Sequence, residues 1–336
     1  MNKVIALGWF LGLAIGTPLQ AQTEKKSPII IAHRGASGYL PEHTEGAKVL
    51  ALSQGADYVE QDVVLSKDGV FVVSHDITME DTTDVEDRYP DRHRPDGRFY
   101  FVDFTWDEIQ KLTVHERTQR KTGQQAFASR FPGGFGQHLM RLEQEVALIR
   151  GWNKVQHTEV GIYVELKSPA FHRQNLGYSM GEKLLPLLKQ LGYSTKEDAC
   201  FVQCFEADEL RLLKSSGCEL KLIQLTGGDR PVSSSDGWEA YLAEIARYAD
   251  GIGPSLDWVI DVDSARELSS SGLVERAHAL NLQVHPYTIR KDSLPKWIFN
   301  IDELHRFLSK NLRVDGFFTD FPDISRDAMS RMGMRD

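Results

Sequence analysis

The stretch IIIAHRGASGYLPEHTEGA, residues 29–47, contains a buried-strand pattern, a glycine-punctuated loop and the start of a helix. This order is ordinary α/β architecture. His33 and Arg34 follow the apolar run directly, and packing does not require a reactive pair at that point. Taken alone, the stretch fits equally well a hydrogen-bonded histidine beside a surface arginine. The rest of the chain therefore decides between the two interpretations.

Short apolar runs and amphipathic segments alternate along the 336 residues, a pattern that predicts repeated βα units around a parallel sheet. Helices are predicted at 43–54, 207–216, 236–248, 264–280 and 302–310. Strands are predicted at 28–33, 57–64, 70–75, 161–166, 200–205, 220–225, 249–254, 282–288 and 314–319. If one of these strands is peripheral, the others form a (β/α)8 TIM barrel, which is the α/β fold that we predict.

Two features interrupt the regular pattern. The segments 57–64 and 70–75 are separated by the turn sequence Ser66-Lys67-Asp68-Gly69, so they form either a hairpin-like pair or two barrel strands. From about residue 77 to residue 156 the βα rhythm stops, and polar, turn-rich sequence replaces it. We interpret 77–156 as a subdomain inserted over one barrel mouth, within a single domain that spans 22–336.

The N-terminal segment has the pattern of a secretory signal peptide. Lys3 precedes an apolar run from Val4 to Gly16, and a polar stretch then ends in the small residue Ala21. We therefore expect residues 1–21 to be removed by cleavage near Ala21 and the protein to be periplasmic. The alternative is a buried N-terminal helix. The apolar run is too short to span a membrane, and no later segment predicts stable membrane insertion.

Cysteine content and charge restrict the function further. An exported protein meets an oxidising compartment, yet only Cys200, Cys204 and Cys218 are present, and we expect no structural disulfide among them. The formal net charge of −9 argues against binding of nucleic acid or of anionic lipid surfaces. An anionic substrate would therefore need cations close to its binding site.

Ionisable residues lie at or near the carboxyl ends of several predicted strands. Side chains alternate along a strand, so Glu60 and Asp62 point to the same side of their strand. For the same reason, Glu165 and Lys167 point to the same side of theirs. The carboxyl ends of barrel strands meet at one mouth, where active sites of this fold lie. Isolated acidic pairs are more often solvated edges, but parallel strands are buried on both faces and buried carboxylates need a cation. Oxygen ligands of this kind suit Ca²⁺ or Mg²⁺ better than zinc.

Over essentially the whole mature chain, the sequence resembles the glycerophosphodiester phosphodiesterase family, specifically its exported, periplasmic bacterial type. The resemblance is specific to this type because residues 83–92, TDVEDRYPDR, are similar to its long insertion. One departure is His43, where many relatives have asparagine in a Glu-Asn-Thr triplet. The core motifs are HRGASGYLPE at 33–42, VEQDV at 59–63, SHD at 74–76, ELK at 165–167 and DGFFTDFPD at 315–323.

The resemblance implies a TIM barrel that cleaves glycerophosphodiesters, such as glycerophosphocholine and glycerophosphoethanolamine, to sn-glycerol 3-phosphate and an alcohol. It implies that His33 and His75 are the general base and acid. One divalent ion, calcium in the periplasmic type and otherwise magnesium, would be bound by Glu60, Asp62 and Glu165. The expected substrate-binding residues are Arg34, Lys167, Gln203, Phe205 and Tyr287, although ordinary barrel packing explains the two aromatic residues equally well.

Other interpretations remain at this point. One is a polyol-phosphate binding protein that has lost catalysis, but both histidines and all three carboxylates are present. Another is a metal-dependent barrel enzyme such as an enolase-like racemase, in which a lysine base usually lies opposite the metal. Two histidines and the single Lys167 favour phosphodiester hydrolysis. The sequence leaves open the oligomeric state, with a homodimer as one option, and an additional surface interaction role.

Overall fold

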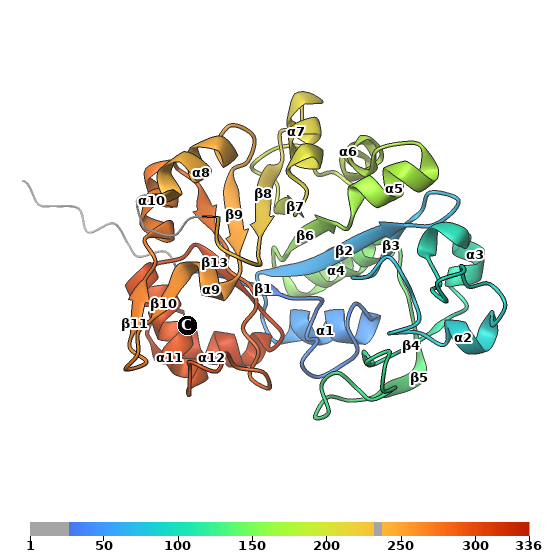
Figure 1. Cartoon of the computed structure of the whole chain (residues 1–336), viewed down its shortest axis with the longest axis horizontal. Coiled ribbons are helices and arrows are strands. Elements are labelled where there is room, and N and C mark those ends of the chain that lie inside the picture. Colours follow the sequence, from blue (N-terminus) through green and yellow to red (C-terminus); the bar gives the residue numbers. More distant parts are fainter. Residues whose placement is uncertain (1–26, 232–236, 336) are drawn as a thin grey trace, which may run out of the picture.

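The computed structural model describes residues 27–231 and 237–335, so the predicted signal peptide and its cleavage near Ala21 lie outside the described residues. Within these ranges, eight parallel strands form a barrel sheet (Figure 1), as predicted. Their hydrogen-bonded order is β12 (Gln283–Val284), β9 (Gly251–Pro254), β8 (Lys221–Thr226), β7 (Cys200–Cys204), β6 (Gly161–Leu166), β2 (Tyr58–Leu65), β1 (Ile29–Ala32) and β13 (Gly316–Thr319).

The two ends of this sheet meet through backbone hydrogen bonds. The Asp315 N–H donates to the Val284 carbonyl at 3.1 Å, and the Ile289 N–H donates to the Phe318 carbonyl at 2.8 Å. The predicted strand over 282–288 is regular only at 283–284, and Pro286, which has no backbone N–H, lies just beyond it. The irregular segment that follows β12 therefore makes part of the contact that closes the barrel.

Helices surround the barrel and bury their apolar faces against it, together forming one large hydrophobic cluster. Three further short elements, α5 (Pro169–Leu176), α9 (Leu256–Val259) and the π-type turn η3 (Phe307–Leu312), lie between them. No helix within the described ranges is long and apolar enough to cross a bilayer. The surrounding helices are α1 (Glu45–Ser53), α4 (Leu142–Gln156), α6 (Met180–Gln190), α7 (Ala207–Ser215), α8 (Trp238–Ile245), α10 (Leu273–Ala279), α11 (Ile301–Arg306) and α12 (Pro322–Arg331).

A smaller apolar cluster fills the inside of the barrel. Its members come from separate strands and include Ile31, Tyr163, Phe201, Ile223 and Phe318, all nearly or fully buried. Tyr163 stacks on Phe201 with ring centroids 4.7 Å apart. These side chains close the barrel interior, so that residues placed two positions later on each strand face the mouth above them.

The structure decides between the two alternatives for the segments 57–64 and 70–75. Strand β3 (Phe71–Val73) pairs antiparallel with β2, with Val63 opposite Val73, and the turn at 66–69 joins the two strands. They are a hairpin. Strand β3 is therefore the peripheral strand that a count of eight barrel strands requires.

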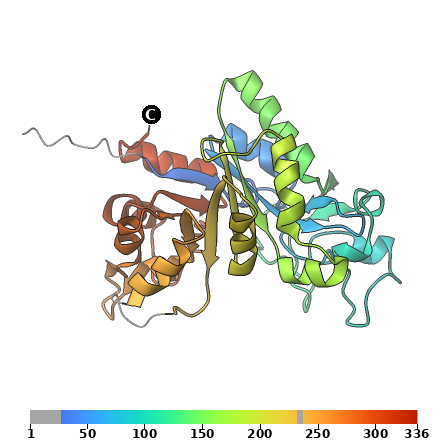
Figure 2. The same ribbon diagram turned by 90° about the horizontal axis from the view of Figure 1, so that it is seen from above.

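The predicted insertion contains its own small core. Residues 77–141 form α2 (Val85–Arg88), η1 (Phe101–Asp103), α3 (Trp106–Ile109), β4 (Thr113–His115) and β5 (Gly133–His138). In both views this segment lies on the side of the molecule opposite α8 and α10 (Figures 1 and 2). The last part of the predicted range forms α4, whose apolar side joins the barrel core. The core of the insertion includes Met79, Val85, Phe101, Phe104, Ile109 and Leu112.

The predicted helix over 264–280 is wrong in its first half. Strands β10 (Ile260–Val262) and β11 (Leu268–Ser270) form a short antiparallel hairpin there, and α10 starts only after Gly272. The Ser271 hydroxyl donates to the Trp258 carbonyl at 2.6 Å, and Gly272 has a φ of 81°. Serine side chains that bond the local backbone and a left-handed glycine both disfavour continuation of a helix.

Candidate active site at the carboxyl ends of the barrel strands

Most of the predicted site residues lie together because they continue the inward-facing rows of the barrel strands; His75 and Arg34 are exceptions. His33 follows Ile31 by two residues, Glu165 follows Tyr163, and Gln203 follows Phe201. They line a pocket of about 130 Å³ above the interior cluster. Its walls are His33, Arg34, Glu60, His75, Glu165, Lys167, Gln203, Phe205, Leu225, Tyr287, Thr288, Arg290 and Phe318.

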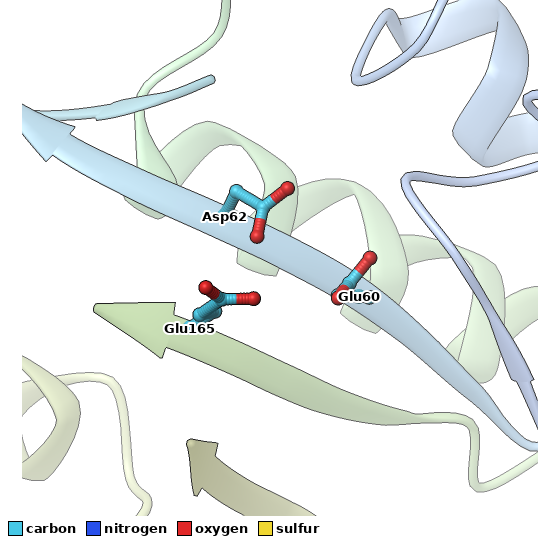
Figure 3. A group of neighbouring side chains, drawn as sticks. All are labelled: Glu60, Asp62 and Glu165. Carbon is cyan, nitrogen blue, oxygen red and sulfur yellow. The ribbon is translucent and has the colours of Figure 1, made fainter. Parts of the chain in front are cut away.

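Three carboxylates form an acidic group at this pocket, and two of them, Glu60 and Glu165, line it. Glu60 and Asp62 come from β2 and Glu165 comes from the adjacent strand β6, where it is paired with Asp62 in the strand register (Figure 3). One oxygen of each lies within 4.8 Å of the others, and all three residues are buried. Burial, with the nearby carboxylates, raises the pKa of Glu60 well above its ordinary value. Burial likewise raises the pKa of Glu165 to about 8.

The chemistry of this group fits a hard divalent cation. Asp62 Oδ1 is buried and has no hydrogen-bond partner. The two oxygens of Glu60 accept from the Arg34 backbone N–H at 2.8 Å and from the Gln203 amide at 3.0 Å, which fixes the orientation of that carboxylate. The carboxylate oxygens repel one another, and one of them has no hydrogen-bond partner. Carboxylate oxygens are the ligands that Ca²⁺ and Mg²⁺ prefer.

Two cations border the acidic group. Lys167 Nζ lies 2.6 Å from Glu165 Oε1 and 3.9 Å from Asp62 Oδ1. Arg34 has a left-handed backbone with a φ of 58°, and its guanidinium lies 2.9 Å from Glu42 and 3.5 Å from Asp62. Both side chains line the pocket, so they supply the local positive charge that an acidic protein needs to receive an anion.

Both histidines line the pocket, and each has a carboxylate on the same ring nitrogen. His33 Nδ1 lies 2.6 Å from Asp320 Oδ1, and His75 Nδ1 lies 2.8 Å from Asp76 Oδ1. Burial lowers the pKa of His33 to about 4, and Arg34 adds to this effect. Burial and then Arg34 also lower the pKa of His75. Two neutral imidazoles whose Nδ1–H groups donate to carboxylates keep Nε2 as an acceptor.

His75 reaches the mouth by a different route from the one expected. It follows β3, which runs antiparallel to β2 and is no barrel strand. The hairpin returns the chain to the level of Asp62, whose carbonyl accepts from the Ser74 N–H at 2.9 Å. The antiparallel pairing, and not the carboxyl end of a barrel strand, therefore places His75 beside the acidic group.

A buried network behind Asp62 was not predicted. His43 Nε2 lies 2.9 Å from Asp62 Oδ2, and its Nδ1 lies 3.2 Å from Lys48 Nζ. An ammonium group only donates hydrogen bonds, so His43 Nδ1 accepts and Nε2–H donates to Asp62. Lys48 is fully buried, donates also to the Glu60 carbonyl and lies 3.1 Å from Glu145. The sequence did not predict the buried position of Lys48, because lysine is common on the exposed side of amphipathic helices.

The remaining predicted residues form the pocket walls. Gln203 binds Glu60, and the Tyr287 hydroxyl donates to the Thr226 carbonyl at 2.9 Å. The Phe205 and Tyr287 rings lie edge to face with centroids 6.1 Å apart, and Phe205 is 47% exposed. An exposed aromatic ring beside the opening provides an apolar surface for part of a ligand. Within the described ranges, Cys200, Cys204 and Cys218 are buried free thiols, as predicted.

Comparisons with known proteins identify the family to which this chain is similar. The model of the glycerophosphoryl diester phosphodiesterase family matches residues 33–324. A glycerophosphodiester phosphodiesterase of Haemophilus influenzae is 38% identical over 96% of this chain and 95% of its own length. One of Treponema pallidum is 36% identical over 88% of this chain and 90% of its own.

Solved structures show the same fold. A glycerophosphodiester phosphodiesterase of Agrobacterium tumefaciens superposes with a TM-score of 0.59 at 23% identity, over 89% of this chain and 99% of that one. A phosphodiesterase of Oleispira antarctica, in complex with the product sn-glycerol-3-phosphate, has a TM-score of 0.62 at 20% identity. That match covers 90% of this chain and 97% of the other.

Proposed function

The chain belongs to the glycerophosphoryl diester phosphodiesterase family, and from this premise we propose that it hydrolyses glycerophosphodiesters to sn-glycerol 3-phosphate and an alcohol. The observation that carries the proposal is the meeting of three buried carboxylates, two histidines and two cations at one barrel mouth. The sn-glycerol-3-phosphate bound by the Oleispira antarctica relative supports a substrate of this class.

Glu60, Asp62 and Glu165 would bind one divalent ion, Ca²⁺ in preference to Mg²⁺. Three carboxylates and one dication leave a net charge of −1. Arg34 and Lys167 then make the site attractive to a phosphodiester, which is also an anion. When bound, the ion would supply charge stabilisation at the phosphoryl oxygens.

His33 and His75 would transfer the protons. Each accepts at Nε2 while Nδ1–H donates to a carboxylate, so one takes a proton from the attacking hydroxyl and the other, once protonated, gives one to the departing alcohol. The two acceptors lie in the walls of the same pocket as the cations. This arrangement supports an acid and a base that exchange roles between steps.

We favour attack on phosphorus by the 2-hydroxyl of the glycerol moiety, followed by opening of the cyclic phosphate by water. An internal nucleophile gains from proximity, which reaches about 7–11 kcal/mol in well-oriented cases. A phosphodiester of propane-1,3-diol keeps the chain length and lacks this hydroxyl. Comparable kcat on this analogue and on the glycerol compound would exclude internal attack in favour of direct attack by water.

Two further parts of the proposal concern the surroundings of the site. The insertion over 77–141 would border the leaving alcohol, since its β4–β5 loop reaches the residues of the mouth. The signal-peptide pattern at residues 1–21 supports export, and N-terminal sequencing of the protein recovered from the periplasm would test cleavage after Ala21.

Product analysis tests the proposed activity. Glycerophosphocholine and glycerophosphoethanolamine are incubated with the protein, with and without chelator, and sn-glycerol 3-phosphate and the free alcohol are quantified. We expect equal amounts of both products from each substrate and none after chelation. Tight binding of the substrates without turnover would instead indicate a polyol-phosphate binding protein.

A further inference from the structure

The two histidines share an arrangement that extends beyond their carboxylates. In both, Nδ1 binds one oxygen of an aspartate, Asp320 for His33 and Asp76 for His75. The second oxygen of each aspartate accepts from an arginine. Arg130 Nη2 donates to Asp320 Oδ2 at 2.7 Å, and Arg117 Nη1 donates to Asp76 Oδ2.

Both arginines come from one segment, the loop 116–132 that joins β4 to β5 in the insertion. His33 and His75 belong to the barrel strand β1 and to the β2–β3 hairpin. A single loop therefore contacts the supports of both histidines, although 190 residues separate Arg130 from Asp320.

We propose that the β4–β5 loop is a positioning element of the active site, in which Arg130 orients His33 through Asp320 and Arg117 orients His75 through Asp76. The inference rests on the proposed function, because it assigns a role to groups that support the two proton-transferring side chains. It concerns positioning residues, since neither arginine lines the pocket.

Arg130 is itself held firmly. Its side chain is 4% exposed, and it donates to Asp292 at 2.8 and 3.1 Å and to the Ser37 carbonyl at 3.0 Å. The Phe127 ring lies 3.7 Å from its guanidinium carbon. A planar guanidinium with several fixed acceptors loses little further freedom when it also binds Asp320.

Arg117 also connects the loop to Arg34, a cation of the pocket, through Glu42. Its Nη2 and Nε donate to Glu42 at 2.6 and 3.1 Å, and Glu42 also accepts from Arg34 at 2.9 Å. Loss of Arg117 would therefore disturb Arg34 as well as His75. Arg130 has a similar connection, because it shares Asp320 with Arg290, which also lines the pocket. Loss of either arginine should therefore disturb a pocket cation as well as a histidine.

The expected effects on kcat depend on which partners Asp320 and Asp76 keep after loss of their arginine. Asp320 is 1% exposed and keeps Arg290, whose Nε donates to the same oxygen at 2.9 Å. The Asp76 side chain is 28% exposed, so water can replace Arg117 there. Each substitution should therefore make the orientation of one histidine less fixed, while the histidine keeps its hydrogen bond to the aspartate. We expect kcat to fall about 10-fold, the lower end of the 10–100-fold range typical for groups that orient functional side chains.

The test is a double-mutant cycle on glycerophosphocholine hydrolysis by the full chain. R130M should lower kcat about 10-fold, raise KM through Asp320 and Arg290, and leave Ca²⁺ affinity within about 2-fold of wild type. In an H33N background, R130M should lower kcat no further, because the histidine through which it affects proton transfer is gone. R117M should behave in the same way toward H75N and should also raise KM, through Glu42 and Arg34.

R120M is the matched control. Arg120 lies in the same loop and binds Glu80 at 2.6 Å, and this buried carboxylate keeps Arg98 as a second partner, just as Asp320 keeps Arg290. We expect R120M to retain wild-type kcat, with a smaller change in thermal unfolding than R130M because the Arg120 side chain is 40% exposed. If R130M is insoluble, R130Q, which keeps a donor toward Asp320, should show a smaller fall in kcat.

The outcomes separate this inference from the proposed function. A wild-type protein that releases no sn-glycerol 3-phosphate would refute the proposed activity and remove the basis of this inference. An active wild type in which R130M has normal kcat, or in which R130M lowers kcat equally in the wild-type and H33N backgrounds, would overturn the inference alone. Equal loss of kcat in R120M would show that the loop acts only through general stability.

Discussion

Replacement of Lys48 by methionine tests the buried network behind the acidic group. Lys48 is fully buried on α1, where its ammonium lies 3.1 Å from Glu145, donates to the Glu60 carbonyl and contacts His43 Nδ1 at 3.2 Å. Methionine has similar length and no charge. The variant K48M therefore leaves the Glu145 carboxylate buried without its cation.

The magnitude follows from these contacts. Removal of one partner of a buried ion pair costs about 3–5 kcal/mol in free energy of unfolding. K48M and the double variant K48M/E145M both leave the Glu60 carbonyl and His43 Nδ1 without the Lys48 donor, at about 1–3 kcal/mol for each group. The double variant, however, leaves no unpaired charge in the interior. The double variant K48M/E145M should consequently be more stable than K48M.

The assay is urea unfolding of wild type, K48M, E145M and K48M/E145M at pH 7. The reasoning would be refuted if K48M lay within 1 kcal/mol of wild type, or if the double variant were as unstable as the sum of the two single variants. Either result would mean that the ammonium and the carboxylate do not depend on each other.

Three further predictions concern single histidines. H33N or H75N should lower kcat at least about 10²-fold with the fold intact by circular dichroism, and near-normal kcat would remove the role assigned to that histidine. H43Q, whose amide reaches the position of Nε2 and keeps a donor toward Asp62, should retain Ca²⁺ affinity in calorimetry, whereas H43L should lose about 10-fold or more; equal affinities would show that the hydrogen bond at 2.9 Å does not matter. The hydrogen bond from His278 to Asp315 raises the pKa of His278, so its stabilising effect is full below pH 6.5 and is lost as pH rises through the raised pKa. H278N should therefore be destabilised relative to wild type in urea at pH 6 and much less at pH 9, and a pH-independent difference would contradict this assignment.

The sequence predicts those parts of the site that follow a strand period. His33, Glu60 and Glu165 lie on inward-facing rows, and the alternation of side chains places them at one mouth before any coordinates are known. The barrel itself follows from alternating βα units for the same reason. The matching family model and the solved relatives confirm this fold and family.

Other features depend on tertiary contacts that carry no local signal. His75 reaches the mouth through an antiparallel hairpin, for which the sequence offered two alternatives. Arg117 and Arg130 lie in turn-rich sequence without periodicity, so nothing local indicates that they contact Asp76 and Asp320. The wrong helix over 264–280 has a related cause, since serine side chains that bond the backbone overrule an amphipathic pattern.

The central claim is that Glu60, Asp62 and Glu165 bind one divalent ion on which hydrolysis depends. Calorimetric titration of the metal-stripped protein with Ca²⁺, with sn-glycerol 3-phosphate release measured in the same samples, tests it most directly. We expect one ion per chain, activity that rises from zero in proportion to occupancy, and loss of both in D62N. Full turnover by the stripped protein, or unchanged Ca²⁺ binding in D62N, would contradict it.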